Sequence, residues 1–152
     1  MSSLPKVFVQ VASDVDIPAS AASMRRWARA ALSSVGRSGD VCIRLVDVAE
    51  MTDLNSRFRD KHGATNVLSF AADSGAHVDG ENLLGDIAIC APVVAAEAAA
   101  QGKRPEDHLA HLVVHGVLHL CGCDHEIAAD AQVMEGREVA ILTALGIADP
   151  YR

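Results

Sequence analysis

The stretch PEDHLAHLVVHGVLHLCGCDH, residues 105–125, predicts a helix that the rest of the chain must enclose. Pro105 is well placed in a first helical turn, and the two acidic residues after it favour the positive end of the helix dipole. From there to about Cys121 the helix is apolar nearly all round except for its histidines. Such a helix is typical of the centre of a domain, and Gly122 is expected to end it.

Three histidines at the end of this helix have the spacing of a metal site. His115 and His119 are four residues apart, which on a helix places them ~6 Å apart along the axis and ~40° apart around it. A left-handed turn at Gly122 lets the chain double back and brings His125 to the third corner. Three neutral nitrogen ligands with an open fourth position are the pattern of a catalytic zinc ion. The sequence therefore predicts one zinc ion per chain.

Two alternatives to this ligand set remain open. His111 and His115 have the same spacing as the later pair, although the glycine and the third histidine favour the later one. We therefore expect His111, like His108, to be a surface residue or a neighbour of the ligands. Cys121 and Cys123 could instead supply thiolates and close the site with two cysteines and two histidines.

The spacing H-x-x-x-H-x-x-G-x-x-H is also that of the metzincin proteases, with one difference. Those proteases carry a glutamate after the first histidine as their general base. Gly116 stands at that position in this chain. The sequence therefore disfavours a peptidase.

The remaining segments predict an α+β fold, a mixed α/β layer with a roughly four-stranded mixed sheet and about five helices. Branched apolar runs indicate strands, and helical periodicity with glycine and proline punctuation indicates helices. The metal site is expected at the end of the central helix, in a single domain over residues 1–152. The predicted strands are 6–12, 41–46, 65–71 and 83–90, and the predicted helices are 20–35, 49–59, 92–102, 105–121 and 128–145.

Composition and charge narrow the function classes. Half of the residues are hydrophobic, which excludes a disordered chain, yet no apolar run approaches the ~20 residues of a membrane helix. No secretory signal is recognisable, so the cytoplasm is the expected compartment. The net charge is −7, but residues 1–61 carry nine basic and seven acidic side chains, against four and thirteen in residues 62–152. A face for nucleic acid must therefore come from the first part of the chain.

Several short motifs occur in an order that characterises a known family. They are Leu54-Asn55, Phe58-Arg59 with Lys61, Thr65-Asn66-Val67-Leu68-Ser69-Phe70, Gly85-Asp86-Ile87, the histidines at 115, 119 and 125, and Ala144-Leu145-Gly146 with Asp149-Pro150-Tyr151. From about residue 40 onward the chain resembles the YbeY family of bacterial endoribonucleases. It departs from the family at Cys121 and at Cys123, where a larger residue is common.

The resemblance implies a zinc-dependent endoribonuclease specific for single-stranded RNA. It implies that His115, His119 and His125 bind zinc, and that Arg59 acts in the family's central cleft. It further implies a role in ribosomal RNA maturation, at the 3′ end of the 16S molecule, and in ribosome quality control. The expected partners are then ribosomal RNA and the ribosome or its proteins, with no membrane.

Hydrolysis of RNA also needs groups that bind the phosphate and move protons. Arg59 suits the first task because its planar guanidinium can bind two phosphate oxygens, and Lys61 could add attraction for the backbone. With no glutamate after His115, a catalytic carboxylate must come from elsewhere. Asp86 and Asp124 are the candidates, although each could instead orient a histidine.

The basic residues of the first part of the chain suggest modest, salt-sensitive RNA binding. With 3% aromatic residues, a base-stacking platform is not expected, which favours recognition of the backbone of single strands. Eight of the thirteen positive charges form this footprint: Arg25, Arg26, Arg29, Arg37, Arg44, Arg57, Arg59 and Lys61.

Two other functions compete with the nuclease. One is a ribosome-associated binding module whose zinc is structural, which a fourth protein ligand would favour because it leaves no open position. The other is a zinc hydrolase of a small molecule or peptide, which the missing glutamate disfavours.

Overall fold

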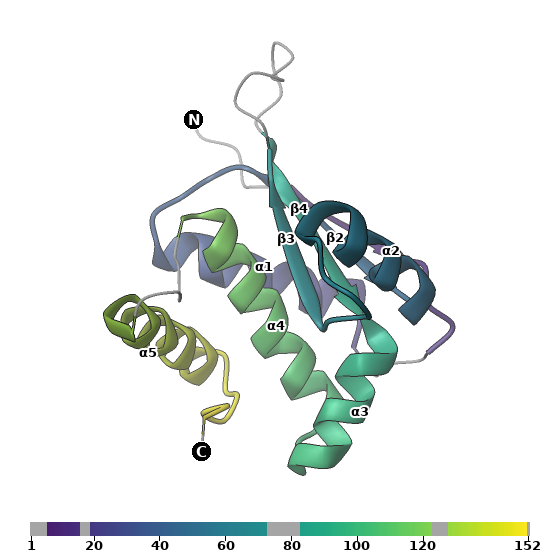
Figure 1. Ribbon diagram of the computed structural model, residues 1–152. Helices are drawn as coiled ribbons and strands as arrows, with labels where there is room; N and C mark the ends of the chain where they lie inside the picture. Colours follow the sequence, from purple (N-terminus) through teal and green to yellow (C-terminus); the bar gives the residue numbers. More distant parts are fainter. Residues whose placement is uncertain (1–5, 16–18, 73–82, 123–127, 152) are drawn as a thin grey trace.

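The computed structural model describes residues 6–15, 19–72, 83–122 and 128–151 (Figure 1). Within these ranges it has four strands and five helices, which confirms the predicted α+β fold. The strands are β1 (Val7–Val11), β2 (Asp40–Val46), β3 (Val67–Ala71) and β4 (Leu83–Cys90). The helices are α1 (Ala21–Ser34), α2 (Val48–Arg59), α3 (Ala91–Gln101), α4 (Pro105–Leu120) and α5 (Ala128–Ala144).

The four strands form one mixed sheet in the order β1-β2-β4-β3. β1 pairs with β2 and β2 with β4 in parallel, whereas β3 runs antiparallel to β4. Parallel neighbours need a crossover between them, and α1 supplies the one between β1 and β2. The sequence patterns did not order the strands, so this order is a finding of the structure.

Helices α1 and α4 cover one face of the sheet (Figure 1). Alternate residues of β2 point to this face, and Val41, Ile43 and Leu45 are all buried there. Helix α4 packs against β3 and β4, with α5 on its far side. Ten of the sixteen residues of α4 are buried, which confirms that the helix quoted above is the centre of the fold.

Helix α2 lies over the other face of the sheet. A smaller apolar cluster is buried beneath it, formed by Val46, Met51, Leu68, Ala88 and Cys90. Because successive strand side chains point to opposite faces, these strand residues alternate with those that contact α4. The sheet therefore separates α2 from α4. The last turn of α2 and the histidines of α4 nevertheless line one common cleft.

The two helices that line that cleft each end at a residue with a positive φ angle. Gly122 has a φ of +91°, so the predicted glycine stop of α4 is confirmed. Helix α2 ends at Asp60, which adopts the left-handed conformation with a φ of +53°. This turn leaves Arg59 as the last helical residue and redirects the chain toward β3.

Gly136 offers a direct test of helix α5. It lies within α5 on the exposed surface, and a Cβ atom added there would meet nothing within 4 Å. Because glycine in a helix costs roughly 0.5–1 kcal/mol relative to alanine, Gly136→Ala should raise the free energy of unfolding by about that amount. Urea denaturation measures it, and a loss of stability would contradict the placement of this residue on an open helix surface.

In the part of the chain that the structure describes, no helix has both the length and the apolar character needed to cross a bilayer.

Candidate active site

A cleft of about 390 Å³ lies where α4, the end of α2 and the start of β3 meet. His115 and His119 line it from α4, and Arg59 lines it from the last turn of α2. Lys61 and Ser69 are also in its wall. The cleft thus brings together the basic end of α2 and the histidines of α4, which are far apart in the sequence.

The two cleft histidines lie one helical turn apart. The ring centroids of His115 and His119 are 5.0 Å apart and their planes are inclined by 58°. Both side chains are partly exposed, so they can reach a ligand in the cleft. His125 lies outside the described residues, as does Cys123, so the third ligand remains a prediction.

Arg59 is held in place by backbone and ring contacts. Its Nη2 donates a hydrogen bond to the carbonyl oxygen of Ser69 at 2.6 Å. Its guanidinium lies over the ring of Phe70, 5.2 Å from the centroid. These contacts hold the planar group in the wall of the cleft that the histidines also line, where a guanidinium suits an anion.

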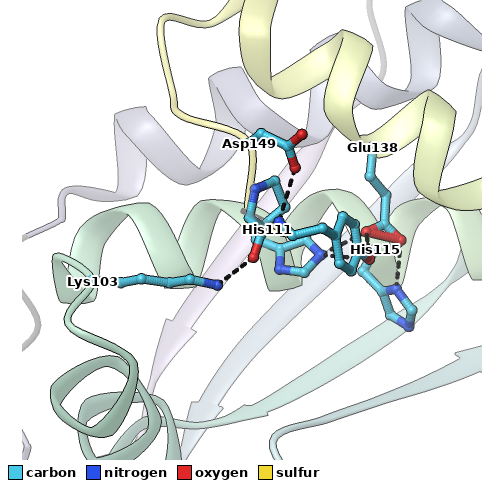
Figure 2. Close-up of polar contacts among 7 residues, drawn as sticks. Lys103, His111, His115, Glu138 and Asp149 are labelled. Atoms are coloured by element: carbon cyan, nitrogen blue, oxygen red, sulfur yellow. Dashed lines mark hydrogen bonds and ion pairs between the residues drawn. The ribbon is translucent and has the colours of Figure 1, made fainter.

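The structure adds one residue that sequence analysis missed. Glu138 of α5 is buried, with 1% of its side chain exposed. Figure 2 shows its carboxylate beside two histidines of α4: His115 Nδ1 lies 2.9 Å from Oε1 and His111 Nε2 lies 2.6 Å from Oε2. The hydroxyl of Tyr151 donates to Oε2 at 2.6 Å.

Sequence patterns do not identify Glu138, because no motif spacing relates a residue of α5 to the histidines of α4. A signal was present in α5 itself. Met134, Glu138, Ile141 and Leu142 are buried and recur at helical spacing, so a carboxylate stands on the apolar face of that helix. A charge on such a face is costly unless it is paired, which marks the position as one with a specific partner.

The hydrogen bonds keep this carboxylate ionised. Burial by itself would raise the pKa of Glu138, but the bonds from His111, His115 and Tyr151 outweigh it and lower the pKa to about 2. Burial and the neighbouring Glu138 carboxylate raise the pKa of Tyr151. At neutral pH the group is thus an anion that accepts hydrogen bonds from three surrounding donors.

The same residues form a group that could hold a cation. One donor atom each of His111, His115 and Glu138 lie within 4.8 Å of one another. This group shares His115 with the predicted ligand set but replaces His119 and His125. A metal site on α4 is therefore supported, and its ligands have two candidate assignments.

The remaining histidines of α4 have different surroundings. The expectation of a surface position is wrong for His108, which is buried and whose Nε2 lies 2.9 Å from Oε1 of Glu97. Glu97 also accepts a hydrogen bond from Nδ2 of Asn66, a residue of the cleft. His111 lies next to the cleft histidines through Glu138, in agreement with a role as a neighbour of the ligands.

The structure does not bring Asp86 to the histidines. Asp86 lines a second cavity of about 360 Å³ together with Cys42 and Phe70, and desolvation raises its pKa. The next residue, Ile87, points to the face that α4 covers, so Asp86 points away from it. Asp124, the other predicted carboxylate, lies outside the described residues.

Gly116 explains why no glutamate follows His115. A Cβ atom at this position would lie 2.9 Å from Cγ2 of Ile87 and 3.3 Å from Oγ of Ser69. The Ser69 hydroxyl also donates a hydrogen bond to the Gly116 carbonyl oxygen at 3.0 Å. Helix α4 therefore touches the sheet here, and the position faces the core and not the cleft.

The cysteines do not assemble into a site in the described part of the chain. Cys42, Cys90 and Cys121 form no disulfide with one another. Cys90 is buried beneath α2 and Cys42 lines the second cavity, so both lie on the face of the sheet opposite α4. Neither can join Cys121 beside the histidines, which disfavours a sulfur-rich metal site.

Fold and site together define a class of protein. It is an α+β protein whose central helix presents a histidine pair to a cleft that a fixed arginine also lines. Imidazoles are common metal ligands and guanidinium groups bind phosphates, so the class is that of proteins with a candidate metal site beside a candidate phosphate site.

The chain belongs to the family described as "Endoribonuclease YbeY", whose sequence model matches residues 10–146. It is 54% identical over 135 residues to the protein of that name from Alkalilimnicola ehrlichii, covering 86% of this chain and 81% of that protein. The corresponding protein of Methylococcus capsulatus is 53% identical over 144 residues, covering 95% and 93%. These relatives support an endoribonuclease role, a hydrolase activity with RNA as substrate.

A solved structure shares the fold. The solution structure of TM1509 from Thermotoga maritima superimposes with a TM-score of 0.57 at 21% identity. It covers 96% of this chain and 99% of that one. This similarity supports the architecture alone.

Proposed function

We propose that the protein is a zinc-dependent endoribonuclease that cleaves single-stranded RNA during ribosomal RNA maturation, at the 3′ end of the 16S molecule. The ribosome or its proteins would be its partner, and its substrate implies action in the cytoplasm. The observation that carries the proposal is one cleft lined by His115, His119 and Arg59. This cleft offers both a cation site and an anion site within one substrate-sized space.

The donor set of the cleft fits zinc. Nδ1 of His115 faces Glu138 and the side chain lines the cleft next to His119, so Nε2 is the ring nitrogen that we assign to zinc. Imidazole nitrogens are common zinc ligands, and His125 is the third ligand we propose. Bound zinc would supply Lewis-acid activation of the attacking water and of a phosphoryl oxygen.

Arg59 binds the phosphate in this proposal. Its contact with the Ser69 carbonyl fixes the guanidinium before substrate arrives, so little side-chain freedom is lost on binding. Lys61 adds positive charge to the same wall. The guanidinium can then bind the oxygens of the phosphate that is cleaved, where negative charge increases in the transition state.

A single substitution tests the assignment of Arg59. Arg59→Ala should lower the rate of cleavage of a labelled single-stranded RNA by about 10²–10³-fold, the effect of losing one fixed donor to a developing oxyanion. Arg104→Ala is the matched control, because Arg104 is exposed, pairs with Glu106 and lies outside both the cleft and the basic footprint. It should change the rate less than about threefold, since an exposed pair of this kind contributes little.

Zinc content, thermal unfolding and cleavage of duplex RNA distinguish a catalytic Arg59 from a structural one and test the specificity for single strands. Zinc content and thermal unfolding of Arg59→Ala should equal those of the wild type, and a loss of either would make Arg59 structural. A duplex of the same sequence should resist cleavage. Equal cleavage of duplex and single strand would show that the specificity for single strands is wrong.

The group of His111, His115 and Glu138, in which the carboxylate is buried, favours a second function. A cation bound there would have little access to substrate, because Glu138 is buried and His111 is only 13% exposed. The protein would then be a ribosome-associated binding module with a structural metal. Zinc-loaded, folded protein that binds single-stranded RNA or ribosomes without cleaving RNA would support this function instead.

A further inference from the structure

We propose that Glu138 is a positioning residue for the metal site, and that Tyr151, in the segment after α5, holds Glu138 in place. The inference rests on the proposed function, because it assigns to His115 the role of a ligand in the cleft. It extends that function to a residue of α5 and to Tyr151, neither of which lines the cleft.

Glu138 determines which ring nitrogen of His115 carries the proton. Carboxylate oxygens accept hydrogen bonds, so the 2.9 Å contact between Nδ1 of His115 and Oε1 of Glu138 favours the tautomer with the proton on Nδ1. A neutral imidazole with a proton on Nδ1 carries its lone pair on Nε2. The ring is 22% exposed at the cleft, so Glu138 fixes both the tautomer and the orientation that a metal ligand needs.

The second step concerns what holds Glu138. Its other oxygen, Oε2, accepts hydrogen bonds from His111 Nε2 and from the Tyr151 hydroxyl, both at 2.6 Å. The three donors come from α4 and from the C-terminal segment, while the carboxylate comes from α5. Because the carboxylate is almost fully buried, losing any of these partners leaves a costly unpaired group, and the arrangement therefore favours one rotamer.

The third step concerns how Tyr151 reaches this position. The backbone N–H of Tyr151 donates to Asp149 Oδ1 at 2.8 Å, and Lys103 Nζ donates to the Pro150 carbonyl oxygen at 2.7 Å (Figure 2). The first bond lies within the C-terminal segment, and the second ties that segment to the turn that precedes α4. The Tyr151 ring also packs edge-on against His111, with centroids 5.4 Å apart.

The distances favour positioning over direct ligation by Glu138. Two ligand atoms of a tetrahedral zinc at ~2.0–2.1 Å are about 3.3 Å apart, whereas hydrogen-bonded nitrogen and oxygen atoms are about 2.7–3.2 Å apart. The contacts of Glu138 with His111 and His115 are 2.6 and 2.9 Å. They have the lengths of hydrogen bonds, including a short charge-assisted one.

Zinc affinity is the property that distinguishes the two roles. Loss of a carboxylate that orients a metal-binding histidine typically weakens metal binding 10–100-fold. Glu138→Ala should therefore lie near the upper end of that range, and Glu138→Gln near the lower end because its amide oxygen can still accept from His115. Tyr151→Phe removes only one bond to Glu138 and should weaken zinc binding by a few-fold. Asp53→Asn, which makes the same exchange of a carboxylate for an amide on the exposed surface of α2, is the matched control and should leave zinc affinity unchanged.

The experiment titrates the full-length protein with zinc alone, in competition with a chromophoric chelator, at a temperature at which each metal-free variant is folded. The order Ala, Gln, Tyr151→Phe and control, from weakest to tightest binding, with one zinc per chain in the wild type, supports the proposal. Should Glu138→Ala fail to fold, Glu138→Gln and Tyr151→Phe decide the matter. Unchanged zinc affinity in the folded Glu138 variants, with altered unfolding only, would reduce Glu138 to a structural role and overturn the proposal.

Two other results would overturn it in different ways. If His111→Gln removes the zinc, then His111, His115 and Glu138 are themselves the ligands. If the wild type binds no zinc, the inference fails together with the metal dependence of the proposed function. A wild type that binds zinc through a Glu138-dependent site but cleaves no RNA would overturn the proposed function and leave the positioning role intact.

Discussion

Removal of the metal is expected to stop cleavage of single-stranded RNA, with a loss of at least about a thousandfold in rate. Metal ions contribute several kcal/mol to the stabilisation of charge in hydrolytic transition states, and each 1.36 kcal/mol is a factor of ten. Two positions at which a catalytic carboxylate could be expected do not supply one: Asp86 lies on the far face of the sheet, and Gly116 follows His115. Without the metal, Arg59 can still bind the phosphate, but the attacking water is no longer activated efficiently.

The measurement compares the protein as isolated, after treatment with a chelator, and after zinc is added back to the chelated sample. Cleavage should disappear in the second arm and return in the third. His119→Ala is the control for a contaminating nuclease, because it removes a cleft nitrogen and should be silent in every arm. Persistent cleavage by the chelated wild type, with a silent His119→Ala, would show that His119 acts without a metal.

The chemistry of one helix made much of this site predictable. Histidines four apart must share a face of α4, so their approach follows from helical geometry alone. The elements were equally accessible, because the periodicity of β4 and the proline and glycine at the ends of α3 and α4 are local signals. The order of the strands was not accessible, since it depends on which crossovers pack together over long sequence separations.

Asp86 and Glu138 show where local patterns stop. The alternation along β4 places Asp86 and Ile87 on opposite faces, but only the assembled sheet shows that α4 covers the face of Ile87. Glu138 reaches His115 from 23 residues away in a separate helix, so no motif contains both. The buried stripe of α5 marks Glu138 as unusual, yet its partners become evident only when α4 and α5 pack together.

Replacing Gly116 by the glutamate that metzincins carry is expected to destabilise the fold by at least about 3 kcal/mol, without creating a peptidase. Overpacking of a tight core contact typically costs 1–3 kcal/mol, and burial of a carboxylate that lacks a partner adds to it. Even the Cβ atom would lie 2.9 Å from Ile87 Cγ2, a branched side chain buried between α4 and the sheet. The glutamate atoms beyond Cβ must push α4 away from β3 and break the hydrogen bond between Ser69 and the Gly116 carbonyl.

Gly136→Glu is the matched control, because it makes the same exchange within a helix where a Cβ atom meets nothing within 4 Å. Its free energy of unfolding should stay the same or rise slightly, since glutamate has the higher helix propensity. Chemical denaturation of both variants gives the difference directly. A folded Gly116→Glu protein as stable as the control would mean that α4 can move off the sheet. In that case the absence of a base beside His115 would reflect the chemistry of the reaction and not the packing of the helix.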